Sequence, residues 1–147
     1  MTRVELTHRF GTSLQAGFDY ITDIENWPAY WPGLVRIEPG SRWTTPGDTA
    51  TLAIRLLGRE VELVLTLEEL TPYRLVAYRS VQQGLPEARH ERHFAASGDG
   101  FDYRLVVEYE PRPGLRGLVV DRLLLRRGVA GAMRRTVENL ERELPES

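Results

Sequence analysis

The segment from Asp48 to Glu110 constrains the fold more than any other part of the chain, because apolar and polar side chains alternate along it. Side chains of a strand point alternately to two faces, so this pattern predicts strands with one buried face. Turn residues separate the runs, which favours antiparallel pairing of neighbours. The predicted strands are Asp48–Leu57, Glu60–Leu70, Arg74–Val81, Ala88–Ala96 and Phe101–Glu110.

The part of the chain before this segment predicts two further strands and two short helices. Arg3–Phe10 alternates like the later strands, and Leu34–Glu38 has the composition of a short strand. Ser13 is a suitable cap for a helix that runs to about Thr22, and Asp23–Tyr30 is predicted as a second short helix. The predicted sheet therefore has six to seven strands.

The last part of the chain predicts one long helix from about Leu115 to Leu144. It contains no proline, its apolar residues recur at helical spacing, and Pro145 is predicted to end it. A sheet with one apolar face and one helix to cover it indicates a single α+β domain over residues 1–147. Because a strongly twisted sheet does not lie flat along a long helix, we expect a ligand-sized space between them.

Composition excludes several classes of function. The chain has no cysteine, and its 19 basic residues are all arginine, so disulfides, thiolate nucleophiles and lysine Schiff bases are absent. With a net charge of −2 and scattered charges, nucleic-acid binding is not expected. No apolar run is long enough for stable membrane insertion, and no secretory signal is evident, which favours a cytoplasmic protein. We predict no cofactor and no metal.

Three sequence motifs carry a resemblance to a known family. They are the aromatic segment Phe18–Gly33 (FDYITDIENWPAYWPG), the hairpin sequence Gly98-Asp-Gly100, and Glu138-Asn-Leu140 near the end. Together with the order of strands and helices, they make the chain similar to the polyketide cyclase/dehydrase and lipid-transport family, which belongs to the superfamily of START domains and birch-pollen-type allergens (SRPBCC). The resemblance covers essentially the whole chain. It implies a helix-grip fold, a curved sheet wrapped around the C-terminal helix, that binds a hydrophobic ligand such as a lipid, steroid or polyketide.

The alternation also predicts which side chains face the ligand space. Tyr30 and Trp31 are expected at its mouth, with Trp27 as a structural residue. The expected apolar walls are Leu52, Ile54, Leu63, Leu65, Tyr103, Leu105, Val107, Met133 and Val137. The expected polar contacts are Tyr78, His90 and Arg92, of which Tyr78 is the least secure because its strand alternates poorly.

Arg92 raises two alternatives. It shares a strand face with His90 and Phe94, so if Phe94 points inward the Arg92 guanidinium does too, and a buried cation needs a partner. A ligand carboxylate, phenolate or enolate would supply it, and so would Tyr103 or Tyr109. Alternatively, the strand lies at an edge and Arg92 reaches solvent along its alkyl stem.

An enzyme and an interaction protein are the alternatives to a binding module. A cyclase or dehydratase acting on a polyketide-like substrate would need His90 or His8 as a base, or a tyrosine and arginine that polarise a carbonyl. His90 and His93 are expected on opposite strand faces, so they cannot share a metal ion. The segment Leu118–Leu125 is apolar nearly all round, which leaves open a ligand portal, a homodimer contact or a surface that touches membranes.

Overall fold

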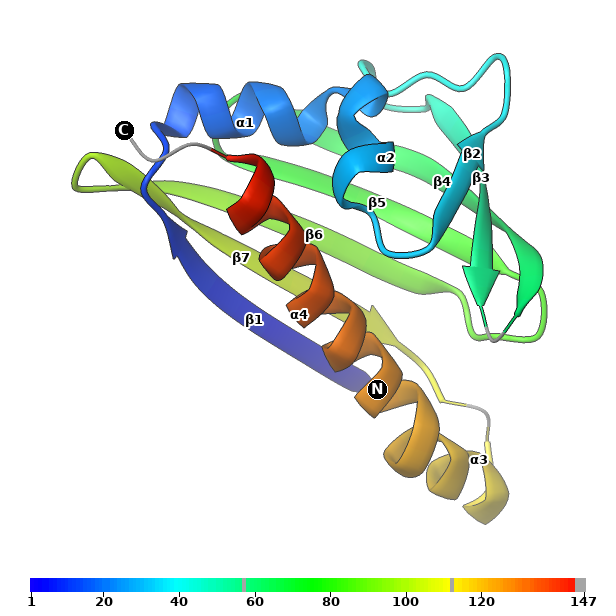
Figure 1. Ribbon diagram of the computed structural model, residues 1–147. Coiled ribbons are helices and arrows are strands. Elements are labelled where there is room, and N and C mark those ends of the chain that lie inside the picture. The colour runs from blue at the N-terminus through cyan, green and yellow to red at the C-terminus, as the bar shows by residue number, and fades with distance from the viewer. Residues whose placement is uncertain (57, 112, 145–147) are drawn as a thin grey trace.

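The structure is a computed structural model that describes residues 1–56, 58–111 and 113–144. These residues form a curved sheet with one long helix across it (Figure 1). Within these residues the sheet has seven strands, all antiparallel, in the order β1-β7-β6-β5-β4-β3-β2. The strands are β1 (Thr2–Phe10), β2 (Leu34–Ile37), β3 (Thr49–Leu56), β4 (Arg59–Thr71), β5 (Leu75–Gln82), β6 (Ala88–Ser97) and β7 (Gly100–Tyr109).

The helices form two groups in the chain, one after the first strand and one after the last strand. Helix α1 (Leu14–Thr22) follows β1 and is capped by Ser13, whose hydroxyl accepts a hydrogen bond from the Ala16 amide. The 3₁₀ turn η1 (Ile24–Asn26) leads into the short helix α2 (Trp27–Tyr30). After β7 come α3 (Leu115–Val120), the π-helical turn η2 (Asp121–Leu125) and α4 (Arg126–Glu143). Thus the predicted helix-grip fold, with two short helices after the first strand, is confirmed.

Strand register places the predicted apolar residues on one face, which α4 crosses on the side of β1 (Figure 1). Leu52 pairs with Leu63, and Leu105 pairs with both Leu6 and Arg92, so all five residues share this inward face. Aromatic residues from β1, α1, β6 and β7 fill the end of the core near α1. These are Phe10, Phe18, Phe94 and Phe101, all at most 5% exposed.

The C-terminal helix is less regular than its sequence predicts, because residues Asp121–Leu125 are π-helical. The Asp121 carboxylate accepts hydrogen bonds from the hydroxyls of Thr2 and Tyr109, which hold this turn against the ends of β1 and β7. Asp23–Tyr30 is likewise not one helix, but a 3₁₀ turn followed by α2. The predicted helix end at Pro145 and the predicted strand end at Leu57 lie outside the described residues, in which α4 ends at Glu143.

A candidate binding site around Arg92

The most unusual group in the interior is the Arg92 guanidinium, which lies on the inward face of β6. Its Nη2 donates to the Tyr78 hydroxyl at 3.0 Å, while its Nη1 is buried and has no hydrogen-bond partner. No carboxylate of the described residues forms an ion pair with Arg92. Burying a cation costs free energy unless the cation is paired. The Arg92 Nη1 group is therefore a buried donor that lacks a hydrogen-bond acceptor.

Tyrosines supply the surroundings of Arg92. Tyr78, Tyr103 and Tyr30 are all nearly fully buried. Each of the three phenols interacts electrostatically with the guanidinium and raises the pKa of Arg92. Burial raises the pKa of Tyr103 to about 12, although the positive charge of Arg92 opposes this rise. The phenols are therefore neutral at physiological pH, and the cation stays without a compensating negative charge.

His90 completes the cluster through Ser80 on the neighbouring strand. Its Nε2 lies 2.8 Å from the Ser80 hydroxyl, and its ring stacks on Tyr78 with centroids 4.5 Å apart. Its Nδ1 is buried without a partner. Burial, together with the neighbouring Arg92 charge, lowers the pKa of His90 to about 3. The ring is therefore neutral, and it is a much weaker base than the ordinary histidine that the cyclase alternative assumed.

The lowered pKa of His90 predicts a pH-dependent contribution to stability. The folded pKa lies below the value of about 6.5 expected for the unfolded chain, so the unfolded state takes up the proton first as the pH falls. The contribution is complete above pH 6.5 and is lost progressively between about 6.5 and 3. Replacing His90 with glutamine should reduce the slope of unfolding free energy against pH in this window by up to about 1.4 kcal/mol per pH unit.

Urea titrations at several pH values measure this slope. The replacement His93→Gln is the matched control, because His93 lies on the outer face of the same strand, where its Nε2 contacts Glu91 at 2.8 Å. Equal slopes for wild type and His90→Gln would show that His90 is not held neutral.

His8 lies apart from this cluster, at the solvent-exposed side of the inward face. Its Nε2 is 2.5 Å from Glu141 Oε1 of α4, and 37% of its side chain is exposed. The histidine thus links the edge strand β1 to α4. His8 is thus half-buried and already has a partner at the surface. This does not favour a role as the base for an enclosed substrate.

The residues predicted as apolar walls fall into two groups. One group is buried and belongs to the packed core: Leu52, Leu65, Tyr103, Leu105, Val107, Met133 and Val137. The other is only partly buried, although its members face the same side of the sheet. Its members are Ile54 on β3 and Leu63 on β4, and Trp31, which packs against Trp27 in the aromatic segment, is also only partly buried. Inward-facing apolar residues that remain partly exposed mark a part of the sheet that the protein does not fully cover.

The aromatic segment at α2 is bound into the structure by its polar atoms. Trp27 Nε1 and the Tyr30 hydroxyl both donate to the Ile21 carbonyl, at 3.1 and 2.7 Å. Asn139 of α4 donates to the Tyr30 carbonyl at 2.9 Å, which joins the segment to the last helix. The Tyr30 hydroxyl is therefore already engaged, and Trp31, half-buried beside Trp27, is the more accessible of the two predicted mouth residues.

Sequence reasoning did not select two neighbours of the cluster. Trp43 packs edge-on against both Trp27 and Tyr78, and it is 5% exposed. It follows a proline-glycine turn in a segment of irregular structure, so no periodicity marks it. Ser80 does follow from alternation, because it lies two residues after Tyr78 on the same face and binds His90.

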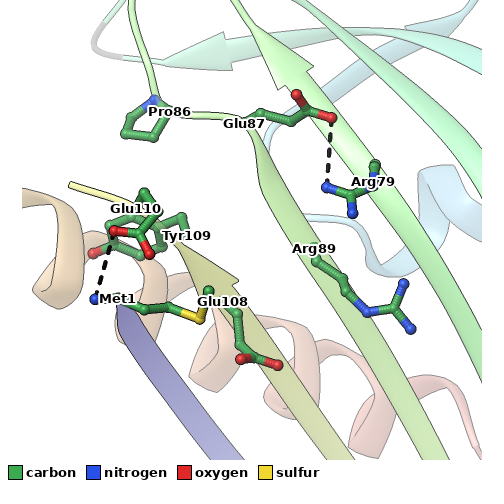
Figure 2. Close-up of a pocket in the computed structure, with 8 residues that line it drawn as sticks. All are labelled: Met1, Arg79, Pro86, Glu87, Arg89, Glu108, Tyr109 and Glu110. Atoms are coloured by element: carbon green, nitrogen blue, oxygen red, sulfur yellow. Dashed lines mark ion pairs between the residues drawn. The ribbon is translucent and has the colours of Figure 1, made fainter. Parts of the chain in front are cut away.

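A hollow of about 400 Å³ lies elsewhere, on the outer side of the sheet (Figure 2). Arg79 and Arg89 line it from β5 and β6, where they point away from the neighbouring Tyr78 and His90. Both arginines are paired with Glu68, and Arg79 also lies 3.7 Å from Glu87. This hollow is open to solvent and its cations already have partners, so it makes a weaker candidate site than the Arg92 cluster.

In the described part of the chain, no three histidine, cysteine or acidic side chains gather in a way that could hold a metal ion. Within the same residues, no helix is long and apolar enough to cross a membrane.

Comparisons with known proteins give a family and a fold. The sequence profile of a family described as polyketide cyclase / dehydrase and lipid transport matches residues 1–145. Among curated proteins, none matches the chain.

Solved structures of similar fold cover nearly the whole chain at low sequence identity. A START superfamily protein from Mycobacterium smegmatis has a TM-score of 0.77 and 12% identity, over 97% of this chain and 96% of that one. The Zhui aromatase/cyclase from Streptomyces sp. R1128 has a TM-score of 0.68 and 15% identity, over 96% and 94%. The Aha1 dimer from Colwellia psychrerythraea has a TM-score of 0.72 and 11% identity, over 98% and 96%. At these identities the similarity establishes the fold alone.

Proposed function

Since the chain belongs to the polyketide cyclase/dehydrase and lipid transport family, whose members generally bind hydrophobic ligands, we propose that it binds a small apolar molecule bearing one anionic oxygen. The oxygen belongs to a carboxylate, phenolate or enolate, and Arg92 holds it. The apolar body of the ligand extends from Arg92 over the apolar inward face of the sheet.

One observation carries this proposal, namely the buried Arg92 Nη1 that lacks an acceptor. An anionic oxygen there would receive a charge-assisted hydrogen bond from the guanidinium, and it would supply the negative charge that the surrounding neutral tyrosines do not. The unpartnered Nδ1 of His90 adds a second polar atom in the same cluster. Together they favour a ligand with a polar end and an apolar remainder.

The partly exposed inward residues show that the inward face of the sheet is not fully covered. Ile54 and Leu63 face the same side as the fully buried Leu52 and Leu65, yet they keep contact with solvent. Covering such residues with a ligand removes apolar surface from water, at about 25 cal/mol for each Å². The proposal is for binding without an assigned reaction, because a pKa of about 3 makes His90 a weak proton acceptor.

A pair of probes that differ in charge tests the proposal by isothermal titration calorimetry. The probes are 2-naphthoate and its neutral analogue 2-naphthalenemethanol. Replacing Arg92 with methionine should weaken the binding of naphthoate roughly tenfold or more, while the affinity for the alcohol changes little. Methionine removes an unpaired buried cation, so we expect this variant to remain folded.

The replacement Arg89→Met is the matched control, because Arg89 lies on the outer face of the same strand and lines the outer hollow. It should leave the affinity for naphthoate unchanged. Loss of naphthoate binding in Arg89→Met but not in Arg92→Met would move the site to the outer hollow and overturn the proposal.

A further inference from the structure

The segment α3–η2, residues 115–125, exposes more apolar surface than any other part of the described chain. Helix α3 has no buried residue, and it projects beyond the ends of β1 and β7 (Figure 1). Its exposed apolar residues, together with those of η2, are Leu115, Leu118, Val119, Val120, Leu123 and Leu124, which are 42–79% exposed. Such a contiguous group on a protein surface indicates an interaction site.

These apolar residues point in several directions around the helix. Consecutive helical residues are about 100° apart, so Leu118, Val119 and Val120 cannot all face one flat partner. A single protein groove covers one side of a helix. Burial of apolar side chains in a lipid interface is non-directional, so an interface can take up side chains that point in more than one direction.

The charge of the surrounding sequence is strongly positive. Residues 111–137 contain seven arginines and one acidic residue, Asp121, which gives +6, whereas the whole chain carries −2, so the remainder carries −8. Asp121 is buried and accepts hydrogen bonds from Thr2 and Tyr109, so its carboxylate does not face the exposed surface. Arg116 and Arg127 are exposed beside the apolar residues.

We propose that α3–η2 is a docking surface for the anionic face of a lipid bilayer. Its apolar side chains enter the boundary of headgroups and acyl chains, and its arginines contact anionic headgroups. The hydrogen bonds of Asp121 to Thr2 and Tyr109 fix this segment to the end of the sheet, so docking gives the whole domain one orientation on the membrane. This proposal does not depend on the identity of the ligand at Arg92.

Sedimentation with vesicles tests the docking surface in the full chain. The protein should bind phosphatidylcholine vesicles that contain phosphatidylglycerol, bind vesicles of phosphatidylcholine alone much more weakly, and lose affinity as ionic strength rises. The double replacement Leu118→Glu and Leu124→Glu should weaken binding roughly tenfold or more. A separate pair, Arg116→Gln and Arg127→Gln, should reduce binding and its dependence on salt.

Two control variants match these changes at other exposed positions. Val81→Glu with Leu85→Glu adds the same charge on and after β5, and Arg55→Gln with Arg59→Gln removes the same charge at the turn between β3 and β4. Both should bind vesicles as the wild type does. Equal losses in test and control variants, or no binding to anionic vesicles, would overturn the proposal. A third outcome would also overturn it. The wild type would form a dimer in sedimentation equilibrium, the Leu118 and Leu124 replacements would dissociate this dimer, and no vesicle binding would be seen.

Discussion

Replacing Gly100 with alanine is expected to lower the free energy of unfolding by about 3 kcal/mol or more. A Cβ atom at this position would lie 1.9 Å from the carbonyl oxygen of Phe10 and 3.0 Å from its carbonyl carbon. Both are backbone atoms at the end of β1, which pairs with the start of β7. Side-chain rotation cannot relieve the overlap, so the two strands must separate. Urea denaturation of the purified variant measures the loss.

The replacement Gly128→Ala is the control for this experiment. A Cβ at Gly128 meets no atom within 4 Å, and the residue is exposed within α4. Alanine should therefore raise the free energy of unfolding by up to about 1 kcal/mol through its higher helix propensity. If Gly100→Ala were as stable as the wild type, the close approach of β1 to the start of β7 would be wrong.

The second large effect concerns Asp121, where replacement with alanine should cost about 3 kcal/mol. The change leaves the Tyr109 hydroxyl, which is buried, and the Thr2 hydroxyl without their acceptor. It also releases the π-helical turn η2 from the sheet. Hydrogen exchange of residues 115–125 should then accelerate more than exchange in the strands, and this local effect separates lost anchoring from general instability.

The replacement Asp121→Asn tests the same contacts with a smaller expected loss of stability. It keeps one acceptor for Tyr109, and its amide can donate to the Thr2 hydroxyl, so we expect a loss of only about 1 kcal/mol. The replacement Asp99→Ala, in the exposed hairpin between β6 and β7, should change stability little. An Asp121→Ala variant with unchanged stability and exchange would contradict the anchoring role.

The sheet was predictable from the sequence because the alternation of apolar and polar side chains can be seen within each single strand. Leu63, Leu65 and Leu67 repeat every two residues, and a single buried face leaves only one register that hides them. Tyr78 was harder to place, since β5 buries Val76, Ala77 and Tyr78 in succession. Pairing with His90, which no local pattern encodes, determines that Tyr78 points inward.

The candidate site was predictable only in part, because its properties arise from pairing between strands. Arg92 and His90 follow from their positions on one strand face, but the missing acceptor at Nη1 depends on every neighbour. The lowered pKa of His90 is also a result of burial and of Arg92, and neither is visible in the spacing of residues. The π-helical turn at Asp121 depends in the same way on Thr2 and Tyr109, which are distant in sequence.

The central claim, that Arg92 holds the anionic end of a ligand, is tested most directly by ¹H–¹⁵N spectra of the arginine side chains. Comparison of wild type with Arg92→Met assigns the guanidinium signals of Arg92 among those of the 19 arginines. Titration with 2-naphthoate should shift the Arg92 signals with the same midpoint that calorimetry gives, and 2-naphthalenemethanol should shift them much less. Naphthoate that shifts only arginines of the outer face, such as Arg79 and Arg89, or that shifts none, would contradict the account.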